Sequence, residues 1–380
     1  MPDRVASLGR DFERLFGSKP SAIVKAPGRV DLMGSHTDYN DGFVLPVAVN
    51  LDTVAVGRLR DDDVISVYSA NFGKTVEFGL DCVAHDEAEP WSNYARGVVV
   101  CLQDAGVELR GANIALHGTV PIGSGMSSSA SIEIAVGFLL QTLVGFEMSG
   151  PELARIGQKA ENKFVGVNTG LMDQFTSRLA KKDHALFLDC RTLAYSYVPL
   201  DTSDVKIVVC DTMKRRGLVG SEYDLRRSQC EEAARMFAQW LPNVKALRDV
   251  SSADFEEHGE KLPDVVRKRA QHIVYENERV LASREALDAG DFEKFASLMD
   301  ESHDSARDLY ELSCPELDAM AEVARAAPGS LCNRLAGAGF GGCSVSLVRD
   351  ESVDEFVDVV REQHEARTGL ATELYVCTAE

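Results

Sequence analysis

Residues 26–46, "APGRVDLMGSHTDYNDGFVLP", hold more polar and charged side chains than a turn needs. An Arg, a His, a Ser and three Asp lie here between apolar, strand-like runs. A turn needs a Gly and an Asp or Asn, each of which relieves a specific backbone constraint. The surplus predicts that this segment binds a ligand or takes part in a reaction.

Residues 120–131, "VPIGSGMSSSAS", have the pattern of an anion site, because a strand-like run precedes them and a helix follows. Glycines let the backbone approach a ligand closely, and the free N–H groups of a helix N-terminus attract phosphate. The segment lacks the Lys of a Walker A loop and has three hydroxyls instead, any of which could ligate Mg²⁺. Helix capping is the structural alternative, but it needs only one serine. The predicted phosphate-binding residues are Gly123, Ser124, Gly125, Met126, Ser127, Ser128, Ser129 and Ala130.

A second glycine-rich segment, 335–348, reads "LAGAGFGGCSVSLV" and contains G-x-G-x-x-G at Gly337, Gly339 and Gly342. A dinucleotide-binding fingerprint follows a strand and opens a helix, whereas here a strand follows. We therefore predict a tight loop that lets two backbones, or a backbone and a ligand, come close.

Strands and helices are intermixed along the chain, which predicts the α+β class. Expected strands are 21–26, 43–49, 53–59, 64–70, 75–80, 113–120, 185–190, 206–212, 343–348 and 372–378. Expected helices are an N-terminal one carrying Val5, Leu8, Phe12 and Leu15, then 91–105, 128–145, 151–164 with Ser149 as N-cap, and most of 221–326. The change to a helical second half suggests a domain boundary near residue 200.

Composition limits the function classes. A net charge of −20 argues against nucleic-acid binding, but a small anion can still be held locally by backbone N–H groups and a metal. No apolar run approaches the roughly 20 residues of a membrane span, and the first residues do not resemble a signal peptide. The nine cysteines are scattered without a CxxC spacing, which favours free thiols over disulfides or zinc. We expect a cytoplasmic protein with no membrane or nucleic-acid partner, and the sequence does not reveal its oligomeric state.

The three segments described above resemble, in order and spacing, the three motifs of the GHMP small-molecule kinases. The first is similar to the signature of galactokinases in particular. Segments between them, such as "GVNTGLMDQFTSRLAKKDHALFLDCRTL" and "CDTMKRRGLVGSEYDLRRSQCEEA", resemble galactokinase sequence too, so the resemblance covers nearly the whole chain.

The resemblance implies the fold and the reaction. Residues 1–200 would form an N-terminal domain like domain 2 of ribosomal protein S5, with the sugar clamp, the phosphate loop and the catalytic Asp. Residues 201–380 would form a ferredoxin-like C-terminal domain with the glycine loop 337–342, and the active site would lie in the cleft between the two domains. The implied reaction is phosphorylation of the anomeric C1 hydroxyl of D-galactose by ATP with Mg²⁺.

The resemblance also implies roles for the residues that handle phosphate. Asp173 in "GLMDQF" matches the catalytic base, and Arg29 in "PGRVD" matches the arginine that pairs with it, although a structural Arg–Asp pair is an alternative. Glu161 matches the glutamate that completes the Mg²⁺ shell opposite Ser128 or Ser129, unless it is simply solvated.

On the sugar side, Asp38 matches the carboxylate that accepts from two adjacent ring hydroxyls. His36 should face the far end of the sugar, and the backbone near Gly170 should touch it. Tyr223 matches a tyrosine that closes over the sugar, and a core aromatic is its alternative.

The chain departs from the galactokinase pattern at the sugar clamp. Ser35 stands where a Glu usually accepts the C6 hydroxyl of galactose, Asp31 replaces an Asn, and 168–170 read "NTG". Ser35 therefore leaves two alternatives to galactose open. The chain could be a 1-kinase for L-arabinose, which has no C6, or for D-galacturonate, because a Glu at position 35 would repel the C6 carboxylate and Ser would not.

An alternative of another class is a sensor that binds galactose and ATP without turnover. Arg29, Asp173 and the unbroken "SSSAS" argue against it. A kinase of mevalonate or homoserine is disfavoured by "HTDY" and "CPELD".

Overall fold

The computed structural model describes residues 2–215 and 219–380, so part of the galactokinase-like segment "CDTMKRRGLVGSEYDLRR", residues 216–218, lies outside the described residues. The chain divides into two compact units. Unit 1 comprises Met1–Gly28, Leu51–Ile122 and Ser127–Leu179, and unit 2 comprises Arg29–Asn50, Gly123–Met126 and Ala180–Glu380. The boundary near residue 200, which concerns the two family domains, stays a prediction.

Unit 1 is built on a twisted sheet in which the order is β4-β3-β5-β2, and β1 pairs with β2. β3 and β5 run parallel, whereas β3–β4 and β2–β5 are antiparallel. The strands are β1 (Ala22–Met33), β2 (Phe43–Leu59), β3 (Val64–Ser69), β4 (Lys74–Gly79) and β5 (Ala112–Gly118), of which β1 and β2 also supply residues to unit 2. The helices are α1 (Pro2–Phe16), η2 (Pro90–Ser92), α2 (Asn93–Asp104), α3 (Ser128–Val144), α4 (Gly150–Lys159), the π-helical turn η3 (Ala160–Val165) and α5 (Met172–Leu179).

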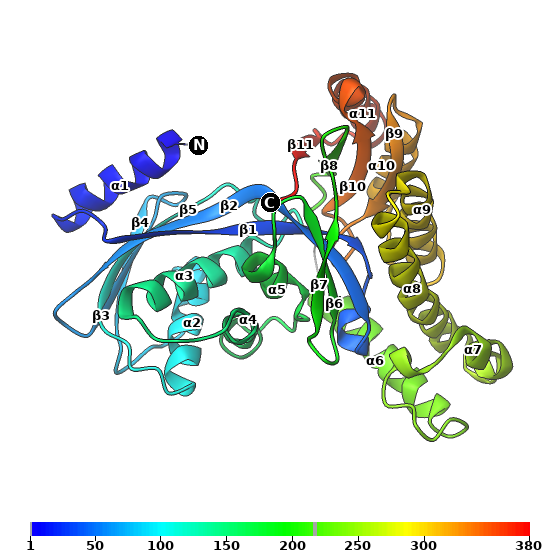
Figure 1. The fold of residues 1–380 in the computed structure, drawn as a ribbon, viewed down its shortest axis with the longest axis horizontal. Helices are drawn as coiled ribbons and strands as arrows, with labels where there is room; N and C mark the ends of the chain where they lie inside the picture. The colour runs from blue at the N-terminus through cyan, green and yellow to red at the C-terminus, as the bar shows by residue number, and fades with distance from the viewer. Residues whose placement is uncertain (1, 216–218) are drawn as a thin grey trace. The chain divides into compact units, whose positions relative to one another are not determined.

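The sheet of unit 1 buries both faces, because its strands alternate apolar side chains at a period of two. Val54 and Val56 of β2 pack with Leu8 and Phe12 of α1, whereas the intervening Ala55 packs with the cluster formed by α2, α3 and α4. Figure 1 shows α1 on one side of this sheet and α2, α3 and α4 on the other. Each fully buried Val or Leu of this kind stabilises the fold by roughly 1.5–3 kcal/mol.

Unit 2 contains a four-stranded antiparallel sheet in the order β11-β8-β10-β9 and a helical layer. Its strands are β6 (His184–Asp189), β7 (Tyr195–Pro199), β8 (Val205–Asp211), β9 (Ser330–Leu335), β10 (Cys343–Arg349) and β11 (Glu373–Cys377). Its helices are α6 (Val219–Phe237), α7 (Ser252–His258), α8 (Asp264–Asp288), α9 (Phe292–Asp308), α10 (Pro315–Ala326) and α11 (Val353–Thr368), with short helices η1 (Asp38–Asn40), η4 (Leu247–Asp249), η5 (Gly259–Lys261) and η6 (Asp350–Ser352).

Unit 2 has an apolar cluster at its four-stranded sheet and another among its helices. Val208 and Val348 of the four-stranded sheet pack with Met320 of α10 and Phe356 of α11. The other cluster joins α6, α8 and the end of α9, with the fully buried Tyr310 among its members.

The structure confirms most elements expected from the sequence and the α+β class. Ser149 caps α4 through a capping box with Glu152, as predicted. The expected strands 43–49 and 53–59 are one strand, β2. Among the longer elements, four were not predicted: β7, β9, the eight-residue α5 and the 16-residue α11. Within the described residues, none of the helices combines the length and apolar character that crossing a membrane would require.

Candidate active site

The predicted phosphate loop, residues 119–127, leads from β5 into α3, whose first helical residue is Ser128. Three loop residues have positive φ: Gly123 (76°), Gly125 (93°) and Ser127 (58°). Glycine adopts this conformation freely, whereas for Ser127 it costs about 1–3 kcal/mol, and such strain is found most often at functional sites. Ala130 is buried in the core of unit 1, so only its backbone could serve a ligand.

Ser127 uses this conformation to reach Asp173, because its Oγ donates to Asp173 Oδ2 at 2.5 Å. Asp173 lies in the first turn of α5, where the helix dipole favours a carboxylate. Gly170, in the connection before α5, is half-buried three residues earlier. Two residues predicted to handle phosphate and proton are thus joined within unit 1.

Glu161 lies at the start of the π-helical turn η3, a feature that often marks functional positions. It is 4% exposed, and its carboxylate accepts hydrogen bonds from Ser129 and from Thr169 Oγ1. Burial, followed by the negative charge of Asp173, raises the pKa of Glu161. The structure therefore pairs Glu161 with Ser129 and excludes the alternative of a solvated side chain.

This carboxylate and hydroxyl pair fits Mg²⁺, which takes one or two carboxylates and fills its other positions with waters and phosphate oxygens. Among the described residues, no group of three or more His, Cys, Asp and Glu side chains is arranged to hold a metal by itself.

A second acid lies behind Glu161 and was not predicted. Glu133 of α3 is 1% exposed, and Gln174 Nε2 bridges the two carboxyl groups at 2.9 Å (Glu133) and 2.7 Å (Glu161). Burial, with the charge of Glu161 added, raises the pKa of Glu133 well above its ordinary value. A single acid in the apolar run "SIEIAVGFLL" was the available sequence signal.

In unit 2, Arg29 is attached to the phosphate loop. Its Nη1 donates to the carbonyl oxygen of Gly125 at 2.6 Å, and its backbone N–H donates to that of Met126 at 3.2 Å. The side chain of Arg29 is 5% exposed. In the same loop, Ser124 Oγ accepts from the N–H of Met126 at 3.3 Å.

The predicted sugar turn, residues 34–42, is stabilised by hydrogen bonds among its own polar groups. Thr37 Oγ1 contacts the carbonyl oxygens of Gly34 and Phe43, at 2.9 and 2.6 Å. Within the turn, His36 has a φ of 60°, and Asp38 is half-buried at the start of η1.

Aromatic side chains surround His36. Its Nδ1 lies 2.7 Å from Tyr39 Oη, which lies 2.7 Å from Tyr310 Oη. The ring centroids of His36 and Tyr223 are 5.2 Å apart. The structure thus brings the predicted Tyr223 together with the predicted His36, and it adds Tyr310, which the sequence did not point out.

Two of the three departures from the galactokinase pattern, Asp31 and Ser35, contact one buried guanidinium. Arg334 is fully buried; its Nη2 donates to Ser35 Oγ at 2.5 Å, and its Nη1 lies 3.4 Å from Asp31 Oδ2. Asp31 Oδ1 also accepts from the N–H of Gly337 at 2.8 Å. The Ser35 side chain is 2% exposed, so its hydroxyl is occupied by the protein rather than open to solvent.

The glycine loop between β9 and β10 brings backbones close, as predicted. A Cβ at Gly339 would lie 2.5 Å from the Leu312 carbonyl oxygen, and a Cβ at Gly341 2.8 Å from that of Lys214. Since Gly337 binds Asp31, the loop also supports the strand that leads into the sugar turn.

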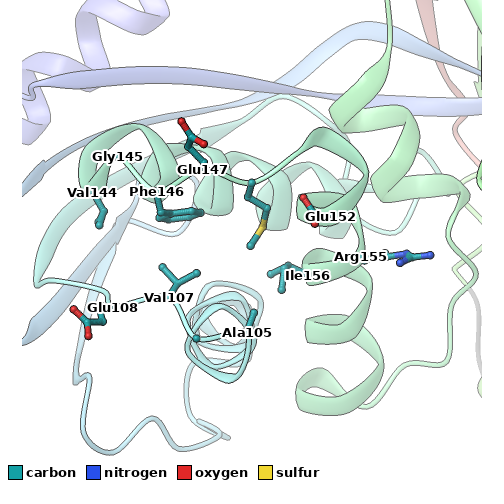
Figure 2. Close-up of a pocket in the computed structure, with 12 residues that line it drawn as sticks. Ala105, Val107, Glu108, Val144, Gly145, Phe146, Glu147, Glu152, Arg155 and Ile156 are labelled. Atoms are coloured by element: carbon teal, nitrogen blue, oxygen red, sulfur yellow. The ribbon is translucent and has the colours of Figure 1, made fainter.

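A groove of about 680 Å³ opens elsewhere in unit 1, at the ends of α2 and α3 and the start of α4. Figure 2 shows it lined by Val107, Phe146 and Ile156, with Glu108 and Arg155 beside it. None of the predicted site residues lines it.

Comparisons with known proteins agree with these motifs. The galactokinase galactose-binding signature matches residues 10–59, the GHMP kinase N-terminal domain matches 93–181, and the GHMP kinase C-terminal domain matches 283–366. The galactokinase of Chloroflexus aggregans is 47% identical over 97% of this chain and 94% of its own length. That of Chloroflexus aurantiacus is 45% identical over 99% and 96%.

Solved structures give the same result. Galactokinase of Lactococcus lactis, crystallised in complex with galactose, is 37% identical and superposes with a TM-score of 0.93 over 99% of this chain and 98% of its own. Mevalonate kinase of Methanococcus jannaschii, 18% identical over 94% of this chain and 98% of its own, shares the fold with a TM-score of 0.66. The chain therefore has the GHMP kinase fold and belongs to the galactokinase family.

Proposed function

We propose that this protein transfers the γ-phosphoryl group of ATP to the C1 hydroxyl of D-galactose, giving galactose 1-phosphate and ADP. The full-length similarity to galactokinases and the likeness to one crystallised with galactose support this activity. The observation that carries the proposal is the hydrogen bond between Ser127, at the phosphate-binding start of α3, and the carboxylate of Asp173.

In this proposal Asp173 accepts the proton of the C1 hydroxyl as its oxygen forms a bond to the γ-phosphorus and the bond to the β-phosphate oxygen breaks. Such a transfer is mostly positioning and charge stabilisation, so the carboxylate must be aimed correctly. Ser127 supports that orientation, because its hydroxyl donates a hydrogen bond to one oxygen of the Asp173 carboxylate.

The phosphate loop and Arg29 would stabilise the charge on the transferred group. Gly123–Ser129 would present N–H and hydroxyl groups to the phosphates. Arg29 carries a permanent positive charge and five N–H donors, and its Nη1 binds the carbonyl oxygen of Gly125 beside the phosphate site. Glu161 and Ser129 would hold Mg²⁺, which when bound neutralises charge on the phosphate oxygens.

On the sugar side we assign Asp38 to two adjacent ring hydroxyls, and His36 with Tyr223 to the opposite end. Because the Ser35 hydroxyl is bonded to Arg334, a galactose O6 would have to find its partner elsewhere on the turn. L-Arabinose and D-galacturonate remain alternative substrates because the Ser35 hydroxyl is already hydrogen-bonded to Arg334. The nine cysteines are all free thiols, which supports a reducing, cytoplasmic setting.

The test is an ATP-consumption assay over galactose, L-arabinose, galacturonate and glucose, with the phosphate position of each product read by ³¹P NMR. We expect galactose to give the highest kcat/KM and a C1 phosphate. A preference for L-arabinose or galacturonate would favour the alternatives. Tight galactose binding with no turnover of any sugar would instead identify a sensor.

A further inference from the structure

Helix α8 presents three polar side chains, His272, Glu276 and Asn277, to the sugar turn within unit 2. His272 and Glu276 are four residues apart and lie on one face of the helix. All three bind residues that lie 234 to 242 positions earlier in the sequence. None of them has a role in the proposed reaction.

Glu276 binds two consecutive peptide groups at the start of the turn. Its Oε1 accepts from the N–H of Gly34 at 3.0 Å and from that of Ser35 at 3.2 Å. The side chain has no exposed surface, and its other oxygen accepts from Arg279 Nε at 2.8 Å. Hydrogen bonds to a buried, charged acceptor are stronger than those between neutral groups.

His272 and Asn277 bind neighbouring parts of the same segment. His272 Nε2 donates to the carbonyl oxygen of Ser35 at 3.2 Å, and its Nδ1 lies 2.9 Å from Ser305 Oγ. Asn277 Oδ1 accepts from the N–H of Phe43 at 3.0 Å. Both ends of the turn are therefore bound to one helix.

The residue after Ser35 needs such support. His36 has a φ of 60°, a conformation that costs a non-glycine residue about 1–3 kcal/mol and persists only when surrounding contacts hold it. The peptide groups fixed by Glu276 and His272 immediately precede it. Loss of these contacts would let His36 relax away from the geometry that its ring contacts with Tyr39 and Tyr223 define.

We propose that Glu276 is a positioning residue for sugar recognition, holding the Gly34 and Ser35 peptide groups so that His36 and Asp38 meet the sugar in a fixed geometry. The inference rests on the proposed function, because it takes the turn to be the galactose site. Glu276 does not touch the substrate in this account.

The decisive variant is Glu276→Gln, which keeps an oxygen acceptor but removes the charge and sets an amide N–H₂ against Arg279. We expect the Kd for galactose, measured by calorimetry without nucleotide, to rise about 10-fold or more, the loss expected for weakened bonds to a charged acceptor. The KM for ATP and kcat at saturating galactose should stay within about two-fold of the parental values. Glu276→Asp keeps the charge, so its Kd for galactose should lie between those of the parent and Glu276→Gln.

Arg269→Met is the matched control, since Arg269 is a buried cation of the same helix that binds Leu309 and Glu311 rather than the turn. It should lower the Tm and leave galactose affinity unchanged. If Glu276→Gln does not fold, Asn277→Ala carries the test, with a rise in Kd of about three- to ten-fold for one lost hydrogen bond.

The outcomes separate the inference from the function it rests on. A parent protein that neither binds nor phosphorylates galactose would overturn both. A parent that does, together with a Glu276→Gln variant whose galactose affinity matches that of Arg269→Met, would overturn the positioning role alone. Where Glu276→Gln does not fold, an unchanged Kd for galactose in Asn277→Ala would overturn it.

Discussion

Ser127, a non-glycine residue at φ 58°, donates a 2.5 Å hydrogen bond to the carboxylate of Asp173. The strained backbone makes the short bond possible, because the left-handed conformation points the Ser127 hydroxyl toward the first turn of α5. This relationship gives Ser127 a role that capping does not explain, since the structure shows no capping hydrogen bond from its side chain.

Two substitutions of Ser127 separate the hydrogen bond from the backbone strain. Ser127→Gly and Ser127→Ala both remove the hydroxyl, but only glycine adopts a positive φ without cost. We predict that both lower kcat by about 5- to 15-fold, the value of one hydrogen bond, and that only Ser127→Ala also lowers the Tm. Steady-state kinetics and thermal unfolding measure these effects. An unchanged kcat in Ser127→Gly would show that the bond does not serve the reaction.

The charge around Arg334 predicts coupling between Asp31 and Ser35. Ser35→Glu would place a second carboxylate beside Asp31 on one buried guanidinium, close to the negative Glu276. We expect Ser35→Glu to lower the free energy of unfolding by about 1–3 kcal/mol, the cost of a buried charge without its own partner. The double variant Asp31→Asn, Ser35→Glu should recover most of the lost free energy of unfolding, because it has one carboxylate on Arg334 again.

Urea unfolding of the parent, both single variants and the double variant closes this cycle. Strictly additive effects would mean that Arg334 does not couple the two positions. The same variants test specificity, because Ser35→Glu should raise kcat/KM for galactose relative to L-arabinose. An unchanged ratio would remove position 35 from sugar recognition.

Glu133 predicts a pH dependence of stability. Burial raises its pKa in the folded state, so its contribution is fully present below the pKa of the unfolded chain, near 4.3, and is lost as the pH rises through the higher folded-state value. Glu133→Gln should therefore gain stability relative to the parent on going from pH 5 to pH 8. Urea unfolding at both pH values measures this, with the exposed Glu147→Gln as control. If the difference in free energy of unfolding between Glu133→Gln and the parent is the same at both pH values, the raised pKa of Glu133 is contradicted.

How much the sequence could predict depended on whether the signal was local. The loop at 119–127 and the helix α3 after it were readable because Gly, Ser and an apolar run occur in consecutive residues. The close approach at Gly339 and Gly341 followed from glycine density alone. The family resemblance identified Ser35 and Asp31 as departures from the galactokinase pattern. It did not reveal that both contact Arg334.

The groups that hold the turn could not be read in this way. Arg334 meets residues about 300 positions away, and Glu276 meets residues about 240 positions away, so only the folded chain brings them together. β9 was missed because Asn333 and Arg334 are polar yet completely buried, which hides the apolar pattern of a strand. α5 has only eight residues, too few to show a helical period, and it carries Asp173.

The central claim is that Asp173 is the base that takes the proton of the sugar hydroxyl. Its most direct test is Asp173→Asn, which keeps an oxygen for Ser127 but cannot accept the proton, with the exposed Asp183→Asn as control. We predict a fall in kcat of about 10²- to 10⁴-fold, while calorimetry still shows ATP and galactose binding with parental affinity. A variant that keeps more than a tenth of the parental kcat would contradict the assignment of Asp173 as the base.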